Sequence, residues 1–222
     1  MTARSLMFIL GGAALTGGAA RASGALIDFE SLPGGPSSDR GSISGQFSPI
    51  NATFSLEGGG SPHLAQTGGT LTAFKSQWGA DQPAPGEEVG HWFLTDDDTV
   101  KGVPKPILIT LGAPVPTFSG QLIDVDKNES FRIEALDADG QVLQTIQVGP
   151  AGDGMVSSWA FDEGDPLIKS VRIQYTGIKT GKVGFAVDNL DIGAPGGIIP
   201  EPASAMLAMG FGGWLIGQRR RR

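Results

Sequence analysis

Short stretches in which apolar and polar residues alternate run through the chain. The clearest are Phe131–Ala135, Val171–Tyr175 and Val183–Val187. Because successive side chains of a strand point to opposite faces, each stretch predicts a strand with one apolar and one polar face. Asp139–Gly140 follows the first stretch, and an Asp-Gly pair favours the positive φ angles of a tight turn. Phe131–Val148 is therefore predicted to form one β-hairpin.

Weaker strand patterns, separated by turn-forming residues, fill much of the remaining central part of the chain. They lie at Ala25–Phe29, Ala52–Leu56, Leu71–Phe74, Val89–Leu94, Ile107–Leu111, Phe118–Val125 and Ser157–Phe161. The 35 glycines and 15 prolines suit tight turns, because both residues are unfavourable inside helices. The pattern predicts an all-β fold, an antiparallel β-sandwich of the jelly-roll type, with long surface loops at Leu32–Ser44 and Ser76–Glu88.

The N-terminus has the three parts of a secretory signal peptide. Arg4 supplies a positive start, an apolar stretch from Leu6 follows, and Ala20-Arg21-Ala22 provides the small-x-small pattern that precedes a cleavage site. Cleavage is predicted after Ala22. The alternatives are a first core strand or an uncleaved anchor, but the glycine-rich stretch is short for a bilayer.

The C-terminus combines a proline-flanked acid, an apolar segment and a basic end. Pro200-Glu201-Pro202 precedes the uncharged segment Ala203–Gly217, and the chain ends in Arg219, Arg220, Arg221 and Arg222. Fifteen apolar residues make a helix of roughly 22 Å, which crosses a membrane only with local thinning or snorkelling of the arginine stems. A short transmembrane helix with its arginines on the cytoplasmic side is predicted. A buried helix with a solvated basic tail is the alternative.

This order of Pro-Glu-Pro, small-residue-rich apolar helix and terminal arginines closely resembles the PEP-CTERM sorting signal of Gram-negative bacteria. The resemblance implies export through the Sec translocon, a transient stay in the inner membrane, and recognition by an exosortase that cuts near Pro-Glu-Pro. It also implies an exopolysaccharide-producing, biofilm-forming cell and delivery to the cell surface or extracellular matrix. The expected division is a signal peptide (1–22), a β-sandwich domain (23–195) and a linker with the sorting segment (196–222).

The part between these ends is distinctly acidic. Of the 16 basic residues six lie at the ends, so the region 23–199 holds 10 basic and 22 acidic residues, a balance of 10 − 22 = −12. Such a charge repels nucleic acid and attracts divalent cations or basic partners. The chain has no cysteine, which excludes disulfides, zinc–thiolate sites and a cysteine nucleophile.

Leu26–Glu30 and Phe185–Leu190 resemble the first and last strands of PEP-CTERM sandwich proteins and, more loosely, of galactose-binding-like jelly rolls. In those jelly rolls the terminal strands often meet and share a structural calcium ion. The resemblance therefore implies that Asp28, Glu30 and Asp188 hold Ca²⁺, for which carboxylate oxygens are suitable ligands. On the residues alone, the preferred interpretation of these acids is solvated residues at strand edges.

Two further acidic groups are weaker candidates. Asp124, Asp126 and Asn128 alternate as at the start of a calcium loop, but an EF-hand needs glycine and an acid where Glu129 and Ala135 stand. The group is therefore interpreted as a polar hairpin turn. The run at 96–98 is interpreted as a solvated turn, with a metal loop as the alternative.

The chain lacks the common enzyme motifs, and we predict that it is not an enzyme. His63 and His91 are not in metal-ligand spacing, and there is no Gly-x-Ser-x-Gly or phosphate-binding glycine loop. Trp78, in a loop rich in Gly, Pro and acid, is a weak candidate for stacking on a sugar. The first hypothesis is a non-catalytic matrix or adhesive protein; a lectin-like glycan-binding module comes second and a secreted hydrolase third.

Overall fold

The computed structural model describes residues 24–67, 75–76, 79–80, 83–87, 89–96, 102–181 and 183–193. Within these residues no helix is long and apolar enough to span a bilayer. The predicted signal peptide with Ala20 and Ala22, the Pro-Glu-Pro motif, the C-terminal helix and the four terminal arginines all lie outside the described residues. The predictions made for them therefore stay predictions.

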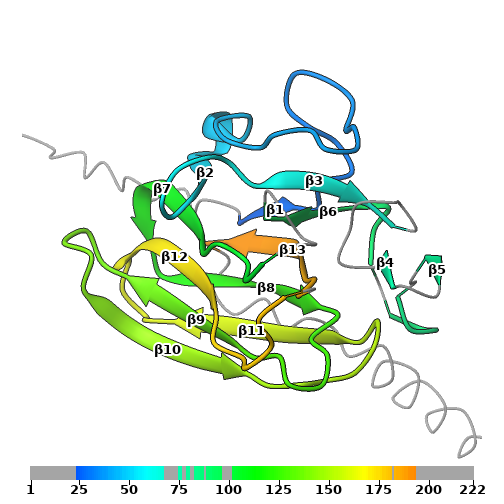
Figure 1. Cartoon of the computed structure of the whole chain (residues 1–222). Coiled ribbons are helices and arrows are strands. Elements are labelled where there is room, and N and C mark those ends of the chain that lie inside the picture. The colour runs from blue at the N-terminus through cyan, green and yellow to red at the C-terminus, as the bar shows by residue number, and fades with distance from the viewer. Residues whose placement is uncertain are drawn as a thin grey trace, which may run out of the picture.

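The described residues form two antiparallel sheets packed face to face (Figure 1). One sheet has the order β11 (Val156–Asp162), β8 (Thr117–Ile123), β13 (Ala186–Ile192), β6 (Trp92–Thr95) and β3 (His63–Gln66), with β1 (Ala25–Ile27) also paired to β13. The other has the order β10 (Val142–Val148), β9 (Phe131–Leu136), β12 (Ile168–Tyr175), β7 (Ile107–Val115) and β2 (Ala52–Leu56). A 3₁₀ turn, η1 (Ser48–Ile50), precedes β2, and β4 (Lys75–Ser76) pairs with β5 (Gly79–Ala80). The predicted all-β antiparallel sandwich is confirmed.

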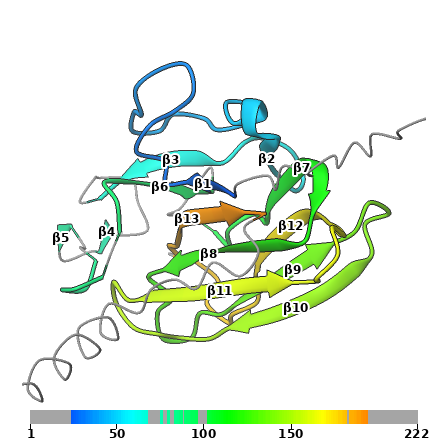
Figure 2. The ribbon, with the colours of Figure 1, turned by 180° about the vertical axis from the view of Figure 1, so that it is seen from behind.

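The core between the sheets is built from the apolar members of the alternating stretches. Phe131, Ile133 and Ala135 of β9 are fully buried, and Phe131 lies 4.8 Å from the ring of Phe185. Phe29 is also fully buried, with its ring centroid 5.7 Å from that of Phe47. Such tilted and edge-to-face pairs add to the area buried by the rings. Figure 2, the view from behind, shows the sheet that contains β11, β8 and β13 on the opposite side of this core.

The hairpin predicted at Phe131–Val148 is confirmed, since β9 and β10 pair antiparallel from Phe131↔Val148 to Leu136↔Val142. Its turn differs in one detail: of the Asp139–Gly140 pair, only Gly140 has a positive φ, of 78°. The Ala52–Leu56 strand matches β2. The strand predicted at Val183–Val187 is displaced, because β13 spans Ala186–Ile192.

The displacement of the last strand follows from a β-bulge. Opposite β8, the pairing jumps from Asp188↔Gln121 to Asp191↔Ser119, so two residues of β13 face Gly120. Asn189 takes a positive φ of 49° inside the bulge. A Cβ at Gly120 would lie 2.7 Å from carbons of Leu190 and Trp159, so the bulge packs only against a glycine. Strict alternation, the pattern used to place strands, fails at such a site.

Candidate functional site

The acids predicted to join the two ends of the domain are neighbours in the fold. Pairing of β1 with β13 sets Ala25 opposite Ile192 and Ile27 opposite Leu190. After β1 the chain turns sharply at Phe29, whose φ is 57°, which places its ring in the core and leaves Asp28 and Glu30 on the surface side.

Asp188 is the buried member of this cluster and accepts backbone hydrogen bonds on both oxygens. The N–H of Asn189 donates to Oδ1 at 2.8 Å, and the N–H of Gly90 donates to Oδ2 at 3.2 Å. Its side chain has no exposed surface. Burial raises the pKa of Asp188 from 3.8 to about 7, the two backbone N–H groups oppose this rise, and the charges of Glu30 and Asp28 add to it.

Glu30 ties the end of β1 to the start of β6. Its Oε1 accepts the N–H of Trp92 at 2.8 Å, and its own N–H donates to Asp28 Oδ1 at 3.1 Å. A Cβ at Gly90 would overlap Glu30 Oε1, so a larger residue there would displace this carboxylate from its present position. Glu30 and Asp188 therefore accept hydrogen bonds from backbone groups of β6, of the loop before it and of β13. Whether Asp28, Glu30 and Asp188 also hold calcium stays a prediction.

A different acidic triad has the spacing of a metal site. Among the described residues, Asp124, Asp126 and Asp153 are the group of three whose ligand oxygens all lie within 4.8 Å of one another. Asp124 is buried with a φ of 65°, and its Oδ1 accepts the N–H of Gly154 at 3.0 Å. Asp126 is half-buried and Asp153 exposed, so the triad opens to solvent on one side.

The 124–129 segment had been interpreted from the sequence as a polar turn, and the metal-compatible partner, Asp153, was missed. Asp153 comes from the loop before β11, and the pairing Val156↔Ile123 brings that loop beside the end of β8. In the sequence, the signal near Asp153 is the pair of glycines that flank it, Gly152 and Gly154. Both take positive φ angles in the structure, 122° and 67°, which glycine adopts readily.

An ion pair between a buried glutamate and a partly exposed lysine borders this triad. Glu129 is 2% exposed, and Lys179 Nζ lies 2.6 Å from its Oε1 and 4.0 Å from Asp126 Oδ2. Burial raises the pKa of Glu129, and the hydrogen bond from Lys179 only partly opposes it. Burial likewise raises the pKa of Asp126; Lys179 lowers it and the charge of Asp153 raises it.

The outer surface of the five-stranded sheet carries cross-strand rows of hydrogen-bonding side chains, here called the polar face. Its members are Glu57, Arg132, Glu134, Thr145, Gln147, Arg172 and Gln174. Glu134 lies between two arginines: Arg172 Nη2 is 2.6 Å from its Oε2 and Arg132 Nε is 3.0 Å from its Oε1. Arg172 also reaches Glu57, and Arg132 Nη2 donates to Gln174 Oε1 at 2.7 Å. The charges of the two glutamates and two arginines sum to zero, and their ion pairs fix the positions of the four side chains.

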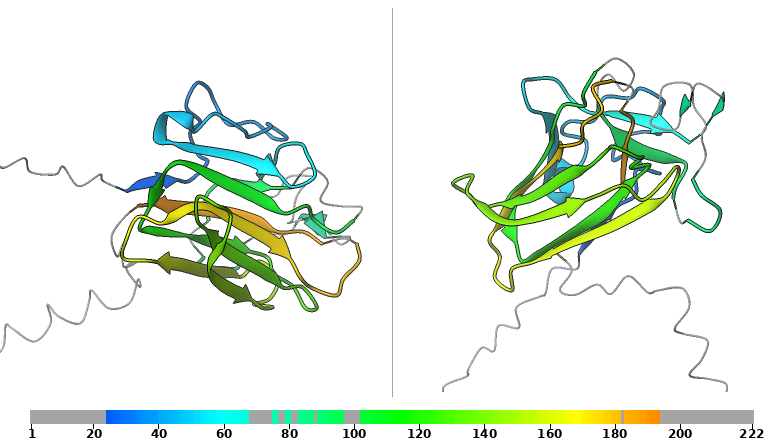
Figure 3. Two further views of the ribbon diagram at one scale, coloured as in Figure 1. Left: turned by 90° about the vertical axis from the view of Figure 1, so that its left-hand side faces the viewer. Right: turned by 60° about the horizontal axis from the view of Figure 1, so that its bottom comes forward.

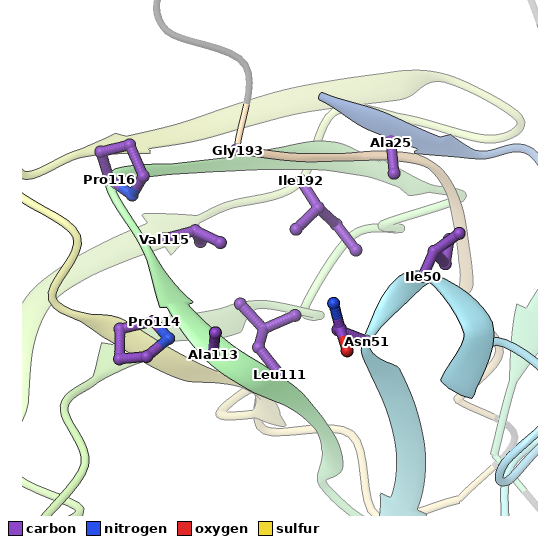
Figure 4. A pocket seen from close by; sticks show the side chains of 10 residues that line it. All are labelled: Ala25, Ile50, Asn51, Leu111, Ala113, Pro114, Val115, Pro116, Ile192 and Gly193. Carbon is purple, nitrogen blue, oxygen red and sulfur yellow. The ribbon is translucent and has the colours of Figure 1, made fainter. Parts of the chain in front are cut away.

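A pocket of about 400 Å³ lies at the end of the sandwich where β1 begins and β13 ends (Figure 4). Its lining side chains are apolar except for the amide of Asn51; the residues are Ala25, Ile50, Asn51, Leu111, Ala113, Pro114, Val115, Pro116, Ile192 and Gly193. Side-chain hydrogen-bonding groups for a sugar are therefore few in this pocket.

The remaining sequence candidates are dispersed. Trp159 is buried and stacks on Phe118 with ring centroids 5.9 Å apart, so it is part of the core. Trp78, the weak sugar-stacking candidate, lies outside the described residues. His63 begins β3, and His91 is exposed with its ring 5.2 Å from that of Trp92.

No protein-family profile matches the chain, and no curated protein matches it. Among solved structures, the chain is similar to TmCBM61 in complex with β-1,4-galactotriose (10% identity, TM-score 0.36, 67% of this chain and 94% of that one). It is also similar to the K1 cleaved adhesin domain of Lys-gingipain from Porphyromonas gingivalis W83 (11%, 0.35, 78% and 99%). A third is the CBM22-1 xylan-binding domain of Paenibacillus barcinonensis Xyn10C (13%, 0.30, 72% and 99%). The fold assignment rests on the strand order and register above.

Proposed function

We propose that this chain is an exported, non-catalytic module that is sorted to the cell surface or extracellular matrix. The pairing of β1 with β13 carries this proposal. Because Ala25 lies opposite Ile192, the two described ends of the domain lie at the same end of the sandwich (Figure 3). The predicted cleavage site at Ala22 and the predicted sorting motif from Pro200 are close in sequence to these two residues. An anchor attached at this end of the sandwich leaves the faces of both sheets free for contacts outside the cell.

The proposal of a non-catalytic module is supported by the position of Asp188. Its pKa of about 7 is the value a general acid needs, but the side chain has no exposed surface. A glycosidic bond could not approach it. Asp126, whose pKa is also raised, lies with Asp124 and Asp153 in an arrangement that suits a cation.

Sorting is tested by Glu201→Ala in the full-length chain. We expect uncleaved precursor to accumulate in the inner membrane, because the proline-flanked glutamate is the proposed recognition element. Fractionation with an antibody to the domain measures this, and Glu163→Ala serves as a charge-matched control. Surface delivery of the Glu201→Ala protein at the level of the unchanged chain would refute exosortase sorting.

Binding of exopolysaccharide is a second candidate function, favoured by the polar face. Its neutral charge balance suits an uncharged polymer, and its amides and guanidinium groups present donors and acceptors in positions fixed by ion pairs. Fixed side chains lose little conformational entropy on binding.

We expect Gln174→Ala to weaken retention on the producing cell's exopolysaccharide about fivefold, the cost of one hydrogen-bonding group. A pull-down of the chain with the exopolysaccharide, repeated over a dilution series, measures this retention. Ser158→Ala, at an exposed position of β11 in the other sheet, is the control. Equal retention of both variants would remove the polar face as the binding site.

Calcium is the cofactor we propose for the Asp124, Asp126 and Asp153 triad. Three carboxylates whose oxygens lie within 4.8 Å of one another provide the hard oxygen ligands that Ca²⁺ takes, and exposure of Asp153 leaves room for water in the remaining positions. Binding there would join the end of β8 to the loop before β11.

A further inference from the structure

The two flanks of the sandwich differ in how their edge strands are covered. On one flank, the chain's own loops pair with the edges of β2 and β3. The N–H of Phe54 donates to Ser44 O at 2.8 Å, and the N–H of Leu64 donates to Gly41 O at 2.8 Å. Leu64 O in turn accepts the N–H of Arg40 at 2.9 Å. The backbone groups of these edges are therefore occupied.

The opposite flank is formed by β10 and β11, and there β10 is open. β10 pairs only with β9, and within the described part of the chain its outward N–H and C=O groups have no backbone partner. One side-chain bond crosses the flank, from Gln144 Nε2 to Asp162 O at 3.0 Å. Figure 1 shows β10 at the rim of the sandwich. β11 has a hydrogen bond at each end. Asp162 O at its last residue accepts from Gln144, and Gly154 O, just before its first residue, accepts the N–H of Ala84.

The sequence of β10 lacks the features that normally block edge-to-edge pairing. Its seven residues, Val-Leu-Gln-Thr-Ile-Gln-Val, include no charge, proline or glycine. Natural edge strands are usually interrupted by lysine, proline or a bulge. The irregular pairing with β9 lies at Val142/Gln144, so the strand is regular from Gln144 to Val148.

We propose that β10 pairs antiparallel with β10 of a second copy of this chain, joining the two five-stranded sheets edge to edge. An identical strand offers the alternating N–H and C=O groups that an edge requires, which a glycan does not. Both strands are uncharged, so no like charges within β10 oppose the pairing.

The direction follows from the hairpin turn. A parallel arrangement would set Asp137 and Asp139 of the two copies side by side, whereas an antiparallel one places each turn beside the far end of the partner strand, at Gly149 and Pro150. An antiparallel two-fold contact is also closed, so it stops at a dimer. Thr145 and Gln147 lie on the polar face, which would continue across the junction.

The test measures the mass of the detergent-solubilised full-length chain by light scattering with the detergent contribution subtracted. The double variant Thr145→Lys with Gln147→Lys adds like charges to exposed positions of β10, and Thr53→Lys adds one at an exposed position of the covered edge strand β2. The expected result is a dimer for the unchanged chain and for Thr53→Lys, and a monomer for the β10 variant. A monomeric unchanged chain, a dimeric β10 variant, or a complex with a different protein would overturn the proposal.

Disulfide trapping gives an independent readout, since the chain contains no cysteine. Thr145→Cys and Gln147→Cys, mixed in one membrane preparation and oxidised, are expected to give a covalent dimer several-fold above that of Thr53→Cys on a non-reducing gel. Equal yields would overturn the proposal. Sorting of the lysine variant stays normal, so failure of this pairing is distinguishable from failure of the proposed function.

Discussion

Replacement of Lys179 by methionine is expected to lower the free energy of unfolding by about 2 kcal/mol, less than the usual cost of breaking a fully buried ion pair because the lysine side chain is 34% exposed. Lys179 Nζ is 2.6 Å from Glu129 Oε1, and Glu129 is almost fully buried. Methionine keeps most of the volume of lysine but leaves the carboxylate without its cation. Urea unfolding at pH 8 followed by circular dichroism measures the loss.

The size of this loss depends on pH in a defined direction. Burial already raises the pKa of Glu129, and loss of Lys179 raises it further, so Glu129 takes up a proton as the pH falls. The destabilisation should therefore be smaller at pH 5 than at pH 8. Lys127→Met is the control, because Lys127 is an exposed lysine in the loop that carries Glu129. Glu129→Gln combined with Lys179→Met should recover part of the loss. Equal losses in Lys127→Met and Lys179→Met would contradict the ion-pair assignment.

The strands that the sequence predicted well are those with strict alternation. Along β9 and β12 every second residue is buried on one side, and their pairing follows from that period. β10, of which only Val148 is buried, is placed by the turn at Gly140 and its pairing with β9. β3 was missed because a four-residue strand beginning with histidine has no alternation, with Leu64 and Ala65 both buried. β13 was displaced because its first three residues, Ala186 to Asp188, are all buried and the bulge that follows them interrupts the alternation.

The acidic clusters show the same limit. The closeness of Asp28 and Asp188 came from a resemblance in the terminal strands, and the β1–β13 pairing agrees with that closeness. The triad depends on Asp153, which lies about thirty residues from Asp124 and meets it only through the β8–β11 pairing. No local pattern marks such a partner, because the contact is set by the register of two strands.

A fall in stability of roughly 4 kcal/mol between pH 4 and pH 8 is expected from Asp188 alone, the linkage equivalent of a pKa raised from 3.8 to about 7. The folded state favours the neutral carboxyl, so its contribution is fully present below about pH 4 and is lost as the pH rises through 7. The raised pKa values of Asp126 and Glu129 act in the same direction. The measurement is therefore the difference between the unchanged chain and Asp188→Asn.

Asparagine cannot ionise, and its amide replaces one of the two acceptors used by Gly90 and Asn189, a cost of about 1 kcal/mol at every pH. Asp188→Asn should be less stable than the unchanged chain at pH 4 and at least as stable at pH 8. A difference that does not change with pH would show that Asp188 ionises as an ordinary surface carboxyl does.

Comparison of the unchanged chain with Asp188→Asn also shows which of the two acidic clusters binds calcium. Calcium at Asp124, Asp126 and Asp153 should stabilise the unchanged chain and Asp188→Asn equally, by about 2.7 kcal/mol at a hundredfold excess over Kd. Asp153→Ser should abolish this, whereas Asp165→Ser, at another exposed acid, should not. Calcium beside Asp188 would instead lower its pKa, flatten the pH dependence and lose its effect in Asp188→Asn. A melting temperature that is the same in calcium and in chelator would refute both sites, leaving the carboxylates as acceptors for backbone N–H groups.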